Sequence, residues 1–197
     1  MTDLQNKVFT VNNPVEVDYA CEEIRKLLAN NISWLSHPYH IAQRFYKKTE
    51  KGSFFYPETY IPDTTPEAKN YTYHRLTPDN DYKGMCFFMI NGSRSNSKDY
   101  KDNILRYSAS VIFSVNLELI SKARLKEYLF TPELMKEVRK LLIDNGMNFN
   151  FAFELVSETR DLKEVYREFI LDDLEQYNRA PLQCFRFDFE ITLNDLC

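Results

Sequence analysis

The stretch CFRFDFEITLND, residues 184–195, alternates apolar and polar side chains along almost its whole length. The apolar positions are Phe185, Phe187, Phe189, Ile191 and Leu193, and the polar positions between them are Arg186, Asp188, Glu190, Thr192 and Asn194. Because successive side chains of an extended strand face opposite sides of a sheet, the pattern predicts a half-buried strand. We expect its charged face to meet solvent, where it discourages nonspecific edge pairing but still permits a specific partner strand.

Three upstream segments carry helix signals. Asn13-Pro14 precedes VEVDYACEEIRKLLANN, and Thr131-Pro132 begins TPELMKEVRKLLIDNG, which places a capping residue before a proline in each first turn. Gly146 follows the second of these helices as a stop signal. The segment LKEVYREFILDDLEQY, residues 162–177, has apolar residues at helical spacing and predicts a third, amphipathic helix.

Several other segments have the composition and alternation of strands. These are residues 40–48 and 53–61, joined by the turn 49–52 into a hairpin, followed by residues 71–78, 84–90, 104–120 and 147–156. Pro57, Pro62 and Pro66 predict that residues 56–70 form an irregular surface segment or a sheet edge, because proline cannot donate to a central ladder. The polar stretch 91–103 contains one apolar residue, Tyr100, and predicts an exposed, mobile loop.

This mixture of elements predicts an α+β fold, a mostly antiparallel sheet with helices packed on one face. At 197 residues and 44% hydrophobic composition, the chain is long enough for one well-buried core. We therefore expect a single domain over residues 1–197, with a flexible hairpin tip at about 91–103.

Composition argues against several classes of function. A net charge of −4 gives no general reason to bind a phosphate backbone, and no apolar run is long enough to cross a bilayer. The chain is thus expected to be soluble and made in a cytoplasm. Its four glycines are too widely spaced for a dinucleotide fingerprint or a P-loop, so no cofactor is predicted. The four cysteines form no CxxC pair; Cys21 and Cys86 are predicted core residues, and Cys197 an exposed thiol.

Catalytic and metal-binding patterns are weak. His37 and His40 could form a zinc site with His74 or a cysteine, but no recognised ligand spacing frames them, and we favour polar residues beside a proline turn. A calcium loop beginning at Asp79 is contradicted by Lys83 and by Ile90 at the position of the bidentate glutamate. The serines at 93, 95 and 97 lack a nucleophile elbow. We therefore predict that the protein is not an enzyme.

The strongest basic cluster is formed by four cations, with Phe45 and Tyr46 interleaved. The four are Arg44, Lys47, Lys48 and Lys51. As a nucleic-acid site this signal is weak, and an ordinary charged hairpin tip is the preferred interpretation.

The order of elements resembles that of small neck or tail-completion proteins of tailed bacteriophages. The resemblance is strongest to proteins of crAss-like and other Bacteroidetes phages. The features that carry the resemblance are an initial helix, the YPETYI segment, LTPDNDYKGMCFFMI with its polar tip, a Thr-Pro helix and the final FRFDFEITLND strand. The resemblance runs over most of the chain. It implies a tail-terminator-like fold and a non-enzymatic virion subunit that oligomerises into a ring between portal and tail. Neighbouring neck and tail proteins would be its partners, and DNA would pass without specific binding.

The same resemblance implies that hairpins, sheet edges and terminal strands contact neighbouring subunits. Carried onto this sequence, the predicted interface residues are Tyr56, Tyr60, Asp63, Ser93, Arg94, Ser97, Tyr100, Asp102, Phe185, Phe187 and Phe189. The small negative net charge is compatible with a channel that DNA traverses without sticking.

Two alternatives stay open. A monomeric binding or regulatory module would use the same aromatic-rich surface toward one partner, since Tyr and Phe suit protein contacts as well as cores. A metal-dependent enzyme would instead be built around His37, His40 and His74.

Overall fold

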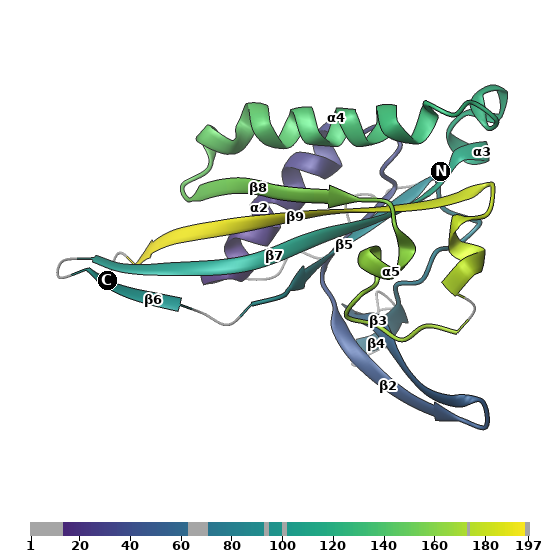
Figure 1. The fold of residues 1–197 in the computed structure, drawn as a ribbon. Helices are drawn as coiled ribbons and strands as arrows, with labels where there is room; N and C mark the ends of the chain where they lie inside the picture. Colours follow the sequence, from purple (N-terminus) through teal and green to yellow (C-terminus); the bar gives the residue numbers. More distant parts are fainter. Residues whose placement is uncertain (1–13, 63–70, 93–94, 100–101, 173, 196–197) are drawn as a thin grey trace.

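A computed structural model describes residues 14–62, 71–92, 95–99, 102–172 and 174–195, which form an α+β fold with two sheets (Figure 1). The larger sheet has the strand order β1-β5-β7-β9-β8, and β6 also pairs with β7. Its strands are β1 (His37–Ile41), β5 (Gly84–Ile90), β6 (Ser95–Asp99), β7 (Asp102–Asn116), β8 (Ala152–Thr159) and β9 (Leu182–Asp195). β1 pairs with β5 in parallel and the other pairs are antiparallel, which confirms the prediction of a mostly antiparallel sheet.

The terminal strand β9 lies near the middle of this sheet. It pairs with β7 from Asn103↔Asp195 to Asn116↔Leu182, and with β8 on its other side. The strand predicted from residues 184–195 is therefore confirmed. Its alternating phenylalanines face the helices, as the hydrophobic pattern requires.

Two long helices cover that face: α2 (Glu16–Asn31) and α4 (Phe130–Asn145), seen above and behind the sheet in Figure 1. The core between helices and sheet includes Ile24, Leu28, Val138, Leu142, Phe113 and Phe187. Both predicted helices exist, but Thr131 is the second residue of α4 and no side chain caps it. Asn13, the predicted cap of α2, lies outside the described residues. The shorter α3 (Leu117–Ser121) and the 3-10 turns η1 (Lys122–Arg124) and η2 (Gly146–Asn148) flank α4.

The opposite face of the sheet is also covered, which the sequence did not predict. Here α5 (Leu162–Val165) and η3 (Leu174–Asn178) pack on a second core that includes Phe87, Ile112, Val165, Tyr166 and Phe169. The prediction that helices pack on only one face of the sheet is therefore wrong, whereas the predicted α+β class is confirmed. The polar face of β9 is likewise buried over its centre, since Arg186 is 0% exposed, whereas Glu190 is exposed as expected.

The long helix predicted over residues 162–177 is wrong, because tertiary contacts interrupt it. α5 ends at Val165, and Ile170 instead exchanges two backbone hydrogen bonds with Phe55, at 2.9 and 3.1 Å. Arg186 also donates to the carbonyl oxygens of Glu164 and Val165, which a continuing helix would have used for its own N–H groups. Most apolar residues of this segment pack in the second core, but most of the segment is not α-helix.

The smaller sheet has the order β2-β3-β4, with β2 (Gln43–Thr49), β3 (Gly52–Pro62) and β4 (Tyr71–Arg75). The predicted hairpin is confirmed by the pairing of Thr49 with Gly52, although His37–Ile41 forms a separate strand in the larger sheet. Residues 56–62 belong to the central strand, contrary to the expected edge. Pro57 is tolerated because it precedes the β3–β4 ladder, and only its carbonyl is used, accepting from Leu76 N at 2.8 Å.

The loop predicted over residues 91–103 is partly a strand. Ser95–Asp99 forms β6, which pairs antiparallel with β7 from Ser95↔Arg106 to Asp99↔Asp102. The end of β9 pairs with the same part of β7, so three strands form an arm that extends beyond the helices in Figure 1. Backbone pairing needs no apolar side chains, which explains why composition alone misjudged this segment.

The predicted core cysteines Cys21 and Cys86 are buried, and Cys197 lies outside the described residues. Among the helices of the described residues, none has the length and apolar character needed to span a membrane.

Gly84 lies where a strand of the larger sheet passes closest to Trp34. A Cβ atom at Gly84 would lie 2.8 Å from Trp34 Cε3 and 3.0 Å from the Trp34 carbonyl oxygen. Gly84→Ala is expected to lower the free energy of unfolding by about 1–3 kcal/mol through overpacking. Chemical denaturation measures this change.

Gly146→Ala is the matched control, since its Cβ would lie 3.6 Å from Phe153, an ordinary contact, at a right-handed helical φ of −57°. It should be neutral or stabilising by about 0.5–1 kcal/mol, because alanine loses less backbone entropy. Equal effects of the two substitutions would contradict the close packing assigned to Gly84.

Candidate assembly surface

β8 forms one edge of the larger sheet. It pairs with β9 on one side, and no strand of the described residues pairs with the other side. The register shifts between Leu155 and Ser157, which marks a bulge at Val156 that divides β8 into the stretches Ala152–Leu155 and Ser157–Thr159. An unpaired edge offers backbone N–H and C=O groups to another chain.

An apolar groove of about 640 Å³ lies beside this edge, between β8 and the end of α4. It is lined by Ile143, Gly146, Met147, Phe149, Phe151, Ala152, Phe153, Glu154 and Leu155. The side chains of Met147 and Ile143 at its rim are 97% and 57% exposed. Exposed apolar side chains gathered around a groove are typical of protein contact sites.

Stacked aromatic rings form the floor of the groove. Phe149 and Phe151 lie parallel with ring centroids 4.7 Å apart, and Phe153 packs on Phe189 of the core at 5.1 Å. Tyr19 of α2 meets Phe151 edge to face at 6.3 Å. The floor is thus fixed by the core while the rim stays open, so little ordering would accompany binding.

An ion pair holds α4 over β8. Arg139 Nε donates to Glu158 Oε2 at 2.8 Å, and its Nη2 donates to the other carboxylate oxygen. This contact joins the two elements that border the groove.

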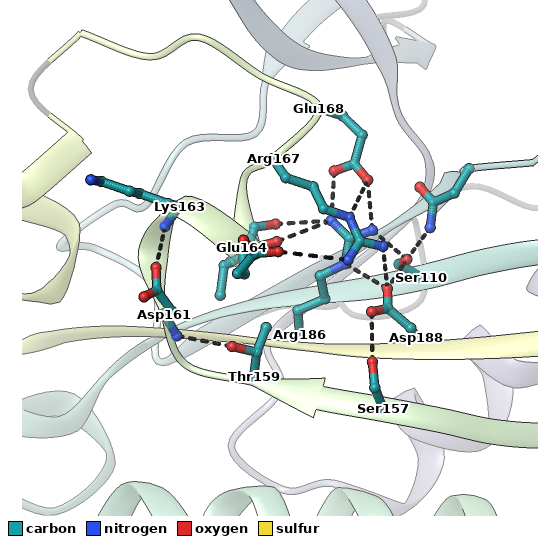
Figure 2. Close-up of polar contacts among 12 residues, drawn as sticks. Ser110, Ser157, Thr159, Asp161, Lys163, Glu164, Arg167, Glu168, Arg186 and Asp188 are labelled. Carbon is teal, nitrogen blue, oxygen red and sulfur yellow. Dashed lines mark hydrogen bonds and ion pairs between the residues drawn. The ribbon is translucent and has the colours of Figure 1, made fainter.

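A buried polar network lies on the opposite face of the sheet (Figure 2). Arg186 donates from Nη1 and Nη2 to the two oxygens of Glu168, at 2.5 and 2.7 Å, and from Nε to Asp188 at 2.7 Å. Its Nη2 also reaches Ser110 Oγ at 2.6 Å. These bonds connect β7, β9 and the segment after α5, so Arg186 fastens that segment to the sheet.

The Asp188 carboxylate accepts three hydrogen bonds in addition to the one from Arg186. It accepts from Ser110 Oγ at 2.5 Å, from Ser157 Oγ at 2.8 Å and from Arg167 Nη2 at 3.1 Å. Throughout the described residues, every buried side-chain nitrogen or oxygen has a partner. A network with balanced charges and satisfied hydrogen bonds is suited to holding structure, and we assign it that role.

The network lowers the pKa of both carboxyl groups. Burial alone would raise the pKa of Glu168, but hydrogen bonds and the charge of Arg186 outweigh it. Burial would likewise raise the pKa of Asp188, and hydrogen bonds from Ser110, Arg186 and Ser157 reverse the shift. Both groups therefore favour the ionised form more in the folded protein than in the unfolded chain.

The three histidines do not converge on one point. The rings of His37 and His74 both stack near the Tyr39 ring, with centroids 6.2 and 5.4 Å from its centroid. His40 faces α2 instead, where its Nε2 lies 3.3 Å from the Asp18 carbonyl oxygen. In the part of the chain that the structure describes, no group of three or more His, Cys, Asp or Glu residues could hold a metal ion.

The predicted interface residues on β9 point into the protein. Phe185, Phe187 and Phe189 are buried against α2 and α4, and Tyr56 is buried beneath the Arg75 guanidinium, 3.9 Å from its ring centroid. Their side chains therefore stabilise the fold, and a partner could meet these strands only through other groups. The interface hypothesis itself stays a prediction.

Three of the remaining predicted residues lie in the arm or in β3. Tyr60 is in β3 opposite Tyr73, Ser97 is in β6 opposite Ile104, and Asp102 begins β7. Asp63, Ser93, Arg94 and Tyr100 lie outside the described residues. The structure brings Ser97 and Asp102 together in the arm and leaves Tyr60 in the smaller sheet.

Sequence reasoning missed the groove, above all Ile143 and Met147. The available signal was Met147 directly after the helix stop Gly146, followed by phenylalanines at 149, 151 and 153. That alternation predicts a strand over residues 147–156, whereas β8 begins at Ala152 and the preceding residues turn around the end of α4.

The chain matches no protein-family model, and it matches no curated protein sequence.

Removing the Arg186 side chain should strongly destabilise the fold. Arg186→Ala leaves Glu168 and Asp188 without their main cationic partner, and we expect a loss of about 3–5 kcal/mol in the free energy of unfolding. Arg139→Ala, which removes a partly exposed pair with Glu158, is the control and should cost about 0–1 kcal/mol. Urea denaturation of both variants measures the difference. Similar losses in the two variants would refute the role assigned to Arg186 in fastening the segment after α5 to the sheet.

The same carboxyl groups should make stability depend on acid pH. Their folded pKa values are lowered, so their contribution is complete above the unfolded values of about 4 and is lost as pH falls through the folded values. The free energy of unfolding should decline below about pH 4, and Asp188→Asn should make that decline shallower. Asp144→Asn, an exposed substitution outside the network, serves as control; an unchanged slope in Asp188→Asn would count against the assignment.

Proposed function

We propose that the protein is a structural subunit of a bacteriophage head-to-tail connector, a neck ring or tail terminator, that self-associates into a ring. In this role it would join portal-side proteins to the tail in the virion, and DNA would pass without specific binding. The proposal involves no catalytic step.

The observation that supports self-association is the apolar groove beside the unpaired edge of β8. A groove with exposed Met147 and Ile143 next to free backbone groups favours a protein partner over a small polar ligand. In a closed ring, each copy covers this surface on its neighbour, so that no copy leaves it open.

The arm formed by β6, the start of β7 and the end of β9 is a second feature compatible with a ring subunit. In Figure 1 it extends beyond the two long helices, so it could reach a neighbouring protein. The specific assignment to a phage connector rests on the order of elements described for the sequence, ending in the strand Leu182–Asp195.

The first experiment is light scattering coupled to size-exclusion chromatography over a range of concentrations, with negative-stain images of the same fractions. We expect rings of defined symmetry. Ile143→Glu combined with Met147→Glu should give folded monomers, because two buried, unpaired carboxylates would oppose closure of the groove.

Tyr128→Glu combined with Leu129→Glu is the matched control, since both residues are exposed at the other end of α4, at 83% and 58%. This variant should assemble as the original chain does. A strict monomer at every concentration would contradict the proposal and favour a monomeric module with one protein partner.

A further inference from the structure

The hairpin of β2 and β3 projects from the body of the protein, away from the two long helices (Figure 1). Residues 43–48 of β2 are exposed on both faces of the strand, including Phe45 at 42% and Tyr46 at 50%. One side of β2 pairs with β3, and no strand of the described residues pairs with its other side. The structure thus presents a second free edge among the described residues, with two aromatic side chains that are about half exposed.

This hairpin is strongly basic within an acidic chain. Arg44, Lys47, Lys48 and Lys51 fall within eight residues that contain one acidic residue, Glu50, whereas the whole chain carries −4. All four cations are exposed, and none forms an ion pair with another described residue. Lysines on an edge strand discourage pairing with ordinary strands, so a partner edge must supply negative charge.

The edge of β8 has the opposite charge. Glu154 lies directly opposite Glu190 of β9 in the strand register, and both carboxylates are exposed. Neither forms an ion pair with a described residue. Like charges directly opposite each other destabilise a sheet, so a cation brought between them would be favoured.

We propose that β2 of one copy adds as a strand to the free edge of β8 in a second copy. The inference rests on the proposed self-association and names the contact that makes it. Charge complementarity selects a second copy as the occupant, because the same chain carries both the basic edge and the acidic edge.

The alternation of side chains fits this pairing. Arg44, Tyr46 and Lys48 share one face of β2, and Phe45 and Lys47 lie on the other. If Phe45 faces the groove floor formed by Phe149 and Phe153, the two cations face the side of Glu154 and Glu190. Regular pairing extends over Ala152–Leu155, the part of β8 before its bulge and next to the groove.

The arrangement predicts the symmetry of the assembly. β2 and β8 lie on opposite sides of the protein in Figure 1, so a copy cannot satisfy its own edge. Each copy donates one strand and accepts one, which is a head-to-tail contact. Such contacts build rings when the rotation between copies closes, and filaments when it does not.

A charge exchange between the two surfaces tests the contact. The hairpin variant carries Arg44→Glu and Lys48→Glu, and the edge variant carries Glu154→Lys and Glu190→Lys. Each alone should raise the concentration needed for assembly by about tenfold or more, since like charges would then meet at one surface. An equimolar mixture should restore assembly, because each mutated surface finds its complement. Light scattering measures all three samples.

Lys126→Glu combined with Lys163→Glu is the control for the hairpin variant, because it makes the same change in net charge at exposed sites outside both strands. It should assemble normally, and far-UV circular dichroism confirms that every variant is folded.

If the original chain assembles and neither the hairpin variant nor the edge variant changes assembly, this contact is overturned. The proposed function would remain intact. Loss of assembly in both variants without recovery in the mixture would also overturn it. A hairpin variant that loses affinity for a labelled DNA strand while assembling normally would identify a polyanion as the hairpin's partner instead. A monomeric original chain would overturn both proposals.

Discussion

The burial of Arg186 on the second face of β9 is the constraint on which the architecture depends. A guanidinium removed from water must be matched by anions and by acceptors for its N–H groups, and Glu168, Asp188 and Ser110 supply them. Because Glu168 lies after α5 and Asp188 on β9, satisfying one side chain requires the loop to sit on the sheet. The sheet consequently has two buried faces, although its sequence alternates as if it had one.

This constraint also explains which elements could be predicted from the sequence. The strands β7 and β9 and the helices α2 and α4 carry periodic apolar patterns, and periodicity directly reports which face meets a core. β5 is instead a continuous apolar run, and both of its faces are buried. Residues 162–177 carry a helical pattern too, yet α5 ends at Val165. There the long-range partners Phe55 and Arg186 occupy backbone groups that a helix needs, and a local pattern contains no information about such partners.

The candidate surface was harder to predict for a related reason. An alternating row of phenylalanines has the same appearance whether its strand is central or at an edge, and exposure depends on strand order. Phe185, Phe187 and Phe189 became core because β9 lies between β7 and β8. Phe149 and Phe151 line an open groove because the chain there turns around the end of α4, a position that no property of these two residues specifies.

Free strand edges normally carry devices that prevent aggregation, and the free edges of β8 and β2 both have them. β8 has a bulge at Val156, and β2 carries lysines at 47 and 48. The groove beside β8 and the aromatic residues on β2 act in the opposite direction, since they increase the apolar area that a correct partner would bury. An edge that resists general pairing yet retains apolar area favours one complementary sequence over all others. This combination is expected where a chain must join copies of itself without joining every exposed strand in the cell.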